Sequence, residues 1–275
     1  MQILLSYHYI QHTNLAEVLA EHFTKPYPEV FLDSGAFSAF SQGASVDIKS
    51  YCAYIYRFKS LLTVYSNLDV IGDAKGTYDN QRILEQEGLH PLPVFHVGEE
   101  WEYLEEYTER YPYIALGGMV PYLRDHKYNL MPWLAKCFRV AKGRAVYHGF
   151  GCTSWQLISS LPWHSVDSST WSRGIRYGEI SIFDKNQGKF IRMFLGVKGY
   201  EKCYKYAHVF RSLGFDPTEF VDRAKNKREK VVRLAVVSFL EAEKWLRKRH
   251  NTNMKLYSAC NEGNLPDFAS IRNGT

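Results

Sequence analysis

Three aspartates follow short apolar runs at separate places in the chain: Asp33 in VFLDSGAF, Asp73 in LDVIGDAKG and Asp167 in HSVDSSTW. Small residues come soon after each of them, as at a strand that ends in a turn. Taken singly, each carboxylate could cap the helix that follows it. If the three strands belong to one parallel sheet, their carboxyl ends share one rim, where mutual repulsion and burial drive pKa values apart. A nucleophile or an acid–base pair beside a recognition carboxylate needs that arrangement.

Two histidines and a pair of glycines also end apolar runs. His96 closes PLPVFH and His148 lies in AVYHGFG, while Gly117 and Gly118 follow YIAL. A hydrogen-bonded structural role is the commoner one for such histidines, and no HxH or HExxH spacing supports a metal site. The two glycines either turn the chain or let a flat ligand approach the backbone amides.

The chain is rich in aromatic residues, with 20 Tyr, 16 Phe and 6 Trp. Most of them are expected in the core. Tyr7, Phe37 and Phe150 stand near strand ends, where an aromatic ring can stack on a nucleic-acid base.

The elements that would hold these residues alternate between strands and helices. Strands are predicted in ILLSYH, VFLD, LDVIGD, PLPVFH, YIALGG, AVYHGFG and HSVD, with helical periodicity between most of them. Such alternation implies parallel pairing. We expect a (β/α)8 TIM barrel rather than a doubly wound open sheet, because a barrel gathers all the polar strand ends into one ring. The eighth strand is expected near residues 179–184 or 190–194.

Asn14 and Asp47 are placed to cap amphipathic helices in LAEVLAEHF and DIKSYCAYIYRFKSLL. Further helices are expected near residues 78–87, in EEWEYLEEYTER, and near residues 130–140. Beyond Gly199 the pattern is purely helical. We therefore expect a catalytic barrel over residues 1–197 and a basic helical C-terminal extension over residues 198–275, packed on the barrel.

Charge is unevenly distributed along the chain. The net charge is +5, yet residues 198–249 alone hold 14 Lys/Arg against 7 Asp/Glu, which allows a polyanionic partner without demanding one. The five cysteines are scattered, without the spacing of a zinc cluster or a disulfide framework. With no signal peptide and no apolar run of membrane-spanning length, we expect a soluble protein of a reducing cytoplasm.

Five motifs together resemble one enzyme family. LDSGAF, VIGDA, ALGG, HGFG and VDSSTWSR occur in the order seen in tRNA-guanine transglycosylases, which are TIM barrels carrying DSGGFQ, FDE, GG, GVG and DCVxPTR motifs. The resemblance covers roughly residues 30–195, and the spacing from Asp167 to Arg173 equals that of the last family motif. Ala36 and Ser38 depart from the family pattern, and the zinc site after the barrel is absent. The variant motifs look more like the DNA-guanine transglycosylases (DpdA type) of phages and bacterial modification islands, which place 7-deazaguanines into DNA.

The resemblance implies a role for each aspartate. Asp167 would be the nucleophile that attacks C1′ of the target nucleoside and displaces guanine, leaving a glycosyl-enzyme ester. Asp33 would be the general acid/base, protonating the departing guanine and later accepting a proton from the incoming 7-deazaguanine. Asp73 would accept hydrogen bonds from the guanine N1–H and exocyclic amine.

The remaining implied contacts surround the base. Gly117 and Gly118 would offer backbone contacts to its carbonyl, and His96 would stand where the family has a glutamine. Arg173 would bind a phosphate or brace the nucleophile loop. This chemistry requires no metal or redox cofactor. Its substrates would be a polynucleotide together with free guanine and a 7-deazaguanine such as 7-cyano-7-deazaguanine (preQ0), in the host cytoplasm if the protein is phage-encoded.

The polymer is the open part of this prediction. Without a zinc element to hold tRNA, the basic helices of residues 198–249 could hold a DNA backbone, or they could form an ordinary solvated face. The target base must leave its stack to reach the mouth of a barrel. The alternatives to DNA base exchange are a zinc-less tRNA-guanine transglycosylase, a non-catalytic nucleic-acid-binding barrel, and an N-glycosidase that releases guanine without replacing it.

Overall fold

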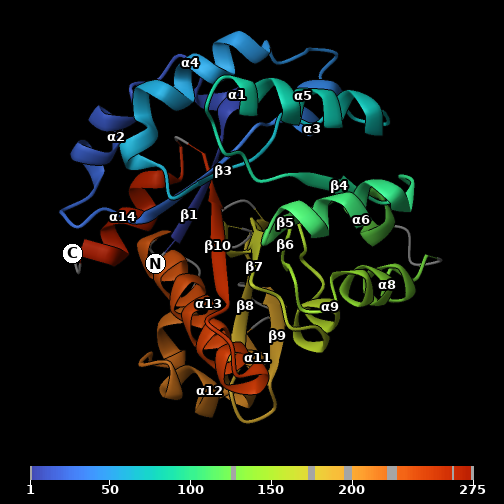
Figure 1. The fold of residues 1–275 in the computed structure, drawn as a ribbon. Helices are drawn as coiled ribbons and strands as arrows, with labels where there is room; N and C mark the ends of the chain where they lie inside the picture. The colour runs from blue at the N-terminus through green and yellow to red at the C-terminus, as the bar shows by residue number, and fades with distance from the viewer. Residues whose placement is uncertain are drawn as a thin grey trace.

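The structure is a computed structural model. It describes residues 2–124, 128–172, 177–194, 200–221, 228–261 and 263–273. Over these residues, an eight-stranded parallel sheet curls through the centre with helices around it (Figure 1). The strand order is β3-β2-β1-β10-β7-β6-β5-β4. The predicted α/β class with parallel pairing is confirmed, and the arrangement is consistent with a (β/α)8-like fold.

Most strands of this sheet are short. Their bounds are β1 Gln2–Ser6, β2 Glu29–Asp33, β3 Val64–Tyr65, β4 Val94–His96, β5 Tyr113–Gly117, β6 Val146–Gly149, β7 Ser165–Ser168 and β10 Lys255–Cys260. At the two ends of the strand order, the chain beside β3 meets the chain beside β4. Ser66 and Leu92 form a parallel bridge, and Leu92 exchanges backbone hydrogen bonds with Tyr65 and Asn67, each at 2.8 Å.

The eighth strand of the sheet is not where the sequence pattern places it. β8 (Glu179–Asp184) and β9 (Lys189–Phe194) occupy the two predicted positions, but they pair antiparallel with each other as a separate two-stranded sheet. β10 is the eighth strand, and it lies between β1 and β7. It comes from the segment expected to be purely helical, so that expectation is wrong and the sheet takes a strand from beyond residue 198.

The third strand is also displaced from its predicted position. β3 ends at Tyr65, whereas residues 67–73 form a loop although LDVIGD reads as an apolar run. Side chains of the next helix bond the backbone of this loop: Thr77 Oγ1 accepts from Val70 N–H, and Asn80 donates to the Leu68 carbonyl. Because these groups satisfy the backbone, the loop has no need of a neighbouring strand.

Helices follow most of the strands and cover the outside of the sheet. Asn14 and Asp47 cap α2 (Leu15–His22) and α4 (Ile48–Phe58) as predicted, each accepting a backbone N–H. The helix expected near residues 78–87 is α5 (Ala74–Gln86), which begins earlier. The others that follow strands are α1 Tyr7–Ile10, α3 Ala36–Ser41, α6 Trp101–Arg110, α7 Val120–Arg124, α8 Met131–Ala141 and α9 Trp155–Ser160.

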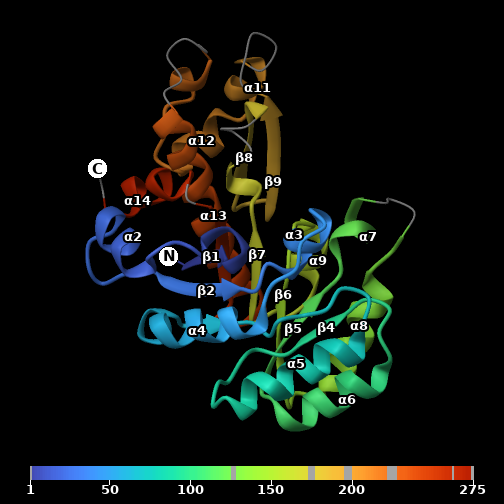
Figure 2. The same ribbon diagram turned by 90° about the horizontal axis from the view of Figure 1, so that it is seen from above.

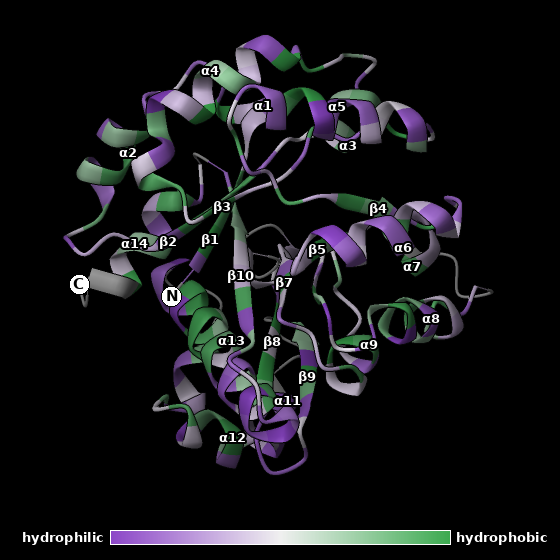
Figure 3. Cartoon of the chain, in the orientation of Figure 1, coloured by the Kyte–Doolittle hydropathy of each residue, from purple (hydrophilic) through white to green (hydrophobic). Residues whose placement is uncertain are grey.

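Apolar residues form separate layers on the two faces of the sheet. The largest cluster lies between the strands and the surrounding helices. A smaller cluster fills the interior and includes Leu4, Phe31, Val94, Ala115 and Tyr257, because alternate residues of a strand point to opposite faces. In Figure 3 the short strand β4 is green, whereas α6 beside it carries purple stretches that face solvent.

The C-terminal helices pack with β8 and β9 into a layer of their own. α11 (Tyr200–Lys205), α12 (Ala207–Ser212) and α13 (Arg228–His250) stand with this hairpin at one end of the molecule, away from α5 and α6 (Figure 2). α14 (Leu265–Asn273) packs beside α13. Four basic side chains of α13 are paired with carboxylates: Arg228 with Asp267, Lys230 with Glu219, Lys244 with Glu241 and Arg247 with Glu243.

All five cysteines are free thiols. Among the described helices, none combines the length and apolar character needed to cross a lipid bilayer.

Candidate active site

A cavity of about 390 Å³ opens at the carboxyl ends of the parallel strands. Asp33, Asp69, His96 and Asp167 line it together with aromatic and aliphatic side chains. In parallel α/β folds this edge of the sheet is the usual place for a ligand. A pocket of this size that is apolar apart from a few converging polar groups is typical of a small-molecule site.

Asp33 ends β2, and the pKa of its carboxyl group is raised. Burial, with smaller contributions from the nearby carboxylates of Asp69 and Asp167, raises the pKa of its carboxyl group to about 8, although the backbone N–H groups of Gly35 and Ser34 act in the opposite direction. Gly35 N–H donates to Asp33 Oδ2 at 3.1 Å. At neutral pH most molecules therefore carry Asp33 protonated, ready to give up a proton.

Gly35 is required by the shape of this turn. Its φ is +74°, and a Cβ there would lie 2.4 Å from Ser6 Oγ and 2.6 Å from His8 Cβ. Only glycine fits such a position without displacing β1 and α1. The predicted small-residue turn after Asp33 is thereby explained.

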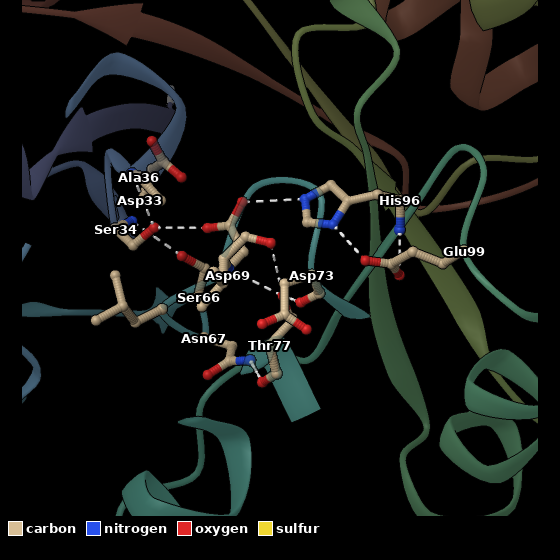
Figure 4. A network of polar contacts seen from close by, with 12 residues as sticks. Asp33, Ser34, Ala36, Ser66, Asn67, Asp69, Asp73, Thr77, His96 and Glu99 are labelled. Carbon is tan, nitrogen blue, oxygen red and sulfur yellow. Dashed lines mark hydrogen bonds and ion pairs between the residues drawn. The ribbon is translucent and has the colours of Figure 1, made fainter. Parts of the chain in front are cut away.

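Asp69 lies in the loop after β3 and is held on both sides (Figure 4). Its Oδ1 accepts from Ser34 Oγ at 2.9 Å, and its Oδ2 is 3.0 Å from His96 Nε2. The other ring nitrogen of His96, Nδ1, is 2.9 Å from Glu99 Oε1. Glu99 also accepts the backbone N–H of His96 at 2.8 Å, so the carboxylate clamps both ring and backbone.

These contacts make His96 an imidazolium between two carboxyl groups. Burial lowers the pKa of His96, but the hydrogen bonds and charges of Asp69 and Glu99 outweigh it and raise the pKa to about 10. In the other direction, burial raises the pKa of Asp69, but His96 and Ser34 outweigh it and the pKa of Asp69 is lowered. Both ring nitrogens are engaged, so His96 lines the cavity without a nitrogen free for a ligand.

Asp167, in β7, approaches the cavity from the opposite side. Its Oδ1 accepts the backbone N–H of Gly151 at 2.7 Å, and His148 Nε2 lies 3.4 Å from the same oxygen. No hydrogen bond to Oδ2 is found within the described residues. One oxygen is thus anchored, whereas the other has no hydrogen-bond partner in the described part of the chain.

Asp73, predicted as the third carboxylate of the site, does not line this cavity. It is exposed and caps α5, accepting Gly76 N–H at 2.9 Å. It borders a neighbouring hollow together with Gly98 and Glu100. The loop that replaces the predicted strand carries Asp69 to the cavity in its place, so the carboxylate four residues earlier is the one that joins Asp33 and Asp167.

Gly117 and Gly118 line the cavity, as predicted, beside His96. A Cβ on Gly117 would lie 2.7 Å from His96 Cδ2, and Gly118 has a φ of +70°. The pair therefore lets the imidazole lie flat against the end of β5. A contact of their amides with a ligand stays a prediction.

The aromatic residues divide into two groups. Phe37 and Phe150 line the cavity, and so does Tyr122 from α7. Phe37 is 45% exposed, which leaves its ring accessible at the rim. Tyr7 belongs to the core instead, where its ring packs against Tyr51 and Tyr54 at 5.0 and 5.2 Å, and the prediction that it could stack on a base is wrong.

Arg173 lies outside the described residues, so its role in binding a phosphate or bracing the nucleophile loop stays a prediction. Over the described part of the chain, no group of three or more His, Cys, Asp and Glu side chains is arranged to hold a metal ion.

The arrangement combines three functions in one cavity. Asp33 can supply a proton near neutral pH, Asp167 has a carboxylate oxygen without a partner among the described residues, and Asp69 is held as an anion by His96. Carboxyl groups whose pKa values are driven apart are the usual signature of separate acid and nucleophile roles.

Sequence reasoning missed Asp69, Glu99 and the partners of His148. Asp69 was hidden by the apolar run around it, which reads as a strand. Glu99 had a local signal, because a carboxylate three residues after a strand-terminal histidine can bond both the ring and the backbone of that histidine.

No protein-family model matches this chain, and no curated protein or solved structure shows significant similarity to it.

Proposed function

We propose that the protein is a closed (β/α)8 barrel that exchanges guanine in DNA for a 7-deazaguanine such as 7-cyano-7-deazaguanine. The observation that carries the proposal is the convergence of Asp33, Asp69 and Asp167 on one aromatic-walled cavity, with the pKa of Asp33 raised to about 8. The bridge between Ser66 and Leu92 supports closure of the barrel.

In the first half of the reaction, Asp167 Oδ2 attacks C1′ of the target nucleotide as the bond to guanine breaks. Asp33 donates its proton to the departing base, so guanine leaves neutral. The sugar is then joined to Asp167 as an ester. In the second half, the incoming 7-deazaguanine gives its proton to Asp33 and attacks C1′, which restores the Asp167 carboxylate. Two inversions retain the configuration at C1′.

Asp69 takes the base-reading role that the resemblance assigned to Asp73. Its carboxylate can accept hydrogen bonds from the N1–H and exocyclic amine of guanine, an edge that adenine and the pyrimidines do not present. His96 keeps Asp69 ionised and oriented instead of binding the base itself. Phe37, Tyr122 and Phe150 offer faces for stacking.

DNA is proposed as the polymer on weaker grounds than the chemistry. Four cations of α13 are already paired with carboxylates, which leaves fewer of them for a phosphate backbone than the sequence count suggests. Lys189 and Arg192 of β9 are both exposed, and Arg192 borders a small hollow beside Ser168 and Thr170 in the segment that follows Asp167.

The test is incorporation of radiolabelled guanine into DNA or tRNA by the purified protein, followed by mass spectrometry for a glycosyl adduct on Asp167. Label should enter DNA with the unchanged protein and with Asp73→Asn, the matched change outside the cavity, but not with Asp167→Asn. Label in tRNA alone would overturn the choice of polymer. Abasic sites without incorporation would indicate an N-glycosidase, and binding without either product would indicate a non-catalytic barrel.

A further inference from the structure

We propose that Tyr113, Ser165 and His148 form a buried hydrogen-bond relay that fixes the tautomer of His148 and aims its Nε2–H at Asp167. The three are positioning residues, since they act on a substrate only through Asp167. The catalytic meaning of the relay rests on the proposed function. Its existence does not, and it can be measured separately.

The register of the strands places the relay in the interior of the sheet. Ala115 of β5, His148 of β6 and Ser165 of β7 are paired across adjacent strands. Tyr113 lies two residues before Ala115, and Asp167 lies two residues after Ser165. Because side chains alternate between the faces of a strand, the three relay residues and Asp167 share one face.

The distances join these side chains into a continuous line. Tyr113 Oη lies 2.6 Å from Ser165 Oγ, and Ser165 Oγ lies 2.6 Å from His148 Nδ1. His148 Nε2 lies 3.4 Å from Asp167 Oδ1. That last contact is longer than an ordinary hydrogen bond, and Nε2 is a buried nitrogen without a hydrogen-bond partner among the described residues. The unsatisfied end of the relay therefore faces Asp167, which lines the cavity.

Counting hydrogens sets the direction of the relay. The Tyr113 hydroxyl has one hydrogen, and Ser165 Oγ is the only hydrogen-bonded partner of that hydroxyl within the described residues. A Tyr113 hydroxyl that accepted instead would leave its own hydrogen without an acceptor among the described residues, so we assign Tyr113 as the donor to Ser165. Ser165 then donates its single hydroxyl hydrogen to His148 Nδ1, which accepts the hydrogen bond through its lone pair. A neutral imidazole with a bare Nδ1 carries its proton on Nε2, so the N–H points at Asp167.

The surroundings of His148 keep it neutral. The ring is fully buried, with the rings of Phe31 and Phe150 each centred 4.6 Å away and that of Tyr257 at 6.1 Å. Burial lowers the pKa of His148, against the opposing pull of Asp167. A neutral imidazole can donate a hydrogen bond to Asp167 without transferring a proton to it. Protonation of Asp167 would end the nucleophilicity of its carboxylate.

The relay also selects which oxygen of Asp167 reacts. Gly151 N–H and His148 Nε2 both lie against Oδ1, so we assign Oδ2 as the oxygen that reacts. When the sugar leaves Asp167 in the second half of the reaction, charge returns to the carboxylate, and these two donors stabilise it. The contact between His148 and Asp167 is expected to shorten at that stage.

The direct test is nitrogen NMR of the protein labelled with ¹⁵N-histidine, with the His148 signals assigned by their loss in His148→Gln. At pH 7 we expect a neutral ring protonated on Nε2. Tyr113→Phe should move the Nδ1 resonance toward that of a free imine nitrogen, because Ser165 loses the donor that polarises its hydroxyl. Tyr147→Phe is the matched control, since that hydroxyl bonds the Cys137 carbonyl outside the relay at 2.9 Å. A ring protonated on Nδ1, a doubly protonated ring, or equal spectra for the two variants would overturn the relay.

The kinetic test compares two amides at position 148 in single-turnover formation of the Asp167 adduct. The amide nitrogen of Gln reaches the place of Nε2, whereas that of Asn reaches only the place of Nδ1. We expect His148→Asn to slow adduct formation on the order of 100-fold and His148→Gln by less than about 10-fold. Equal losses would refute positioning through Nε2. If the NMR spectra agree with the relay but the protein forms no adduct on Asp167, the transglycosylase proposal is wrong and the relay stands.

Discussion

Two histidines, His96 and His148, lie at the carboxyl ends of strands on opposite sides of the cavity and carry opposite charge states. His96 is held between the carboxyl groups of Asp69 and Glu99, and its pKa rises to about 10. His148 is surrounded by aromatic rings and bonds the hydroxyl of Ser165. The one carboxyl group near it, that of Asp167, is 3.4 Å away, so burial prevails and the pKa of His148 is lowered. Both are buried. The difference shows that the number and closeness of carboxylate partners, rather than burial, decide whether such a histidine is charged.

The two sides consequently suit different tasks. The charged side of β2, β3 and β4 holds an anion, Asp69, in a fixed orientation for recognition. The neutral side of β6 and β7 leaves Asp167 with one uncommitted oxygen and a neighbour that does not protonate it. In the proposed reaction, recognition and bond formation would thus take place on opposite sides of the cavity.

Exchanging one carboxylate on each side for an amide should separate these tasks most clearly. Asp167→Asn removes the nucleophile, and we expect guanine exchange to fall by at least about 1,000-fold. Asp69→Asn removes a charged acceptor, and the KM for guanine should rise by about 10- to 100-fold with adduct formation preserved. Steady-state and single-turnover kinetics decide this. Adduct formation that persists in Asp167→Asn would place the nucleophile elsewhere.

Removing each histidine should cost different amounts of stability. His96→Leu leaves Asp69 and Glu99 buried without their partner, which lowers the free energy of unfolding by about 3–5 kcal/mol. His148→Leu mainly loses the bond to Ser165, for about 1–2 kcal/mol. Urea denaturation at pH 7 measures both. Equal losses would show that the charge difference between the two sides is not real.

Alkaline pH should weaken the charged side selectively. The pKa of His96 rises from 6.5 to about 10 on folding, so its stabilisation is complete below pH 6.5 and is lost as the pH rises to about 10. The slope is about 1.4 kcal/mol per pH unit for one proton. His96→Gln should flatten the decline in unfolding free energy between pH 8 and pH 10, whereas His148→Gln should leave it unchanged. A decline that both variants retain would assign it to other groups.

The pH profile of catalysis should reflect Asp33. Its pKa is raised to about 8, and the proton-donating form is therefore lost as the pH rises through that value. We expect kcat/KM to fall about tenfold per pH unit above pH 8. The same shift makes the folded state bind this proton more tightly than the unfolded chain, so Asp33 adds to the loss of stability between about pH 4 and pH 8. A profile that stays flat to pH 9.5 would exclude Asp33 as the acid.

The smallest effect is expected at Asp73. Asp73→Ala removes the cap of α5 and should lower the free energy of unfolding by about 1 kcal/mol, with guanine exchange unchanged. Thermal denaturation and the incorporation assay measure the two quantities. A loss of exchange like that in Asp69→Asn would return the recognition role to Asp73.

Sequence reasoning located most of the residues that line the cavity, but not the hydrogen bonds and strand pairings that hold them. Asp33, His96 and Asp167 could be placed because each ends a strand whose apolar run is unambiguous. Asp69 could not, because VIGD reads as a strand, and only the side chains of Thr77 and Asn80 show how the loop satisfies its backbone. β10 escaped notice because KLYSAC is short and follows a 23-residue helix. The relay beneath Asp167 depends on the register of three strands, which no local pattern reports.

The position of β10 has a consequence for how the chain comes to be folded. It is inserted between β1, near residue 4, and β7, which carries Asp167, so its neighbours are separated from it by about 250 and 90 positions along the chain. A growing polypeptide that has emerged only as far as residue 250 exposes the unpaired edges of both strands. Folding on the ribosome can assemble the earlier helices first, but the strand that bears the candidate nucleophile acquires this neighbour only after residue 260 has emerged. Such long-range closure is slow and leaves a window in which chaperones, or other nascent chains, can engage those edges.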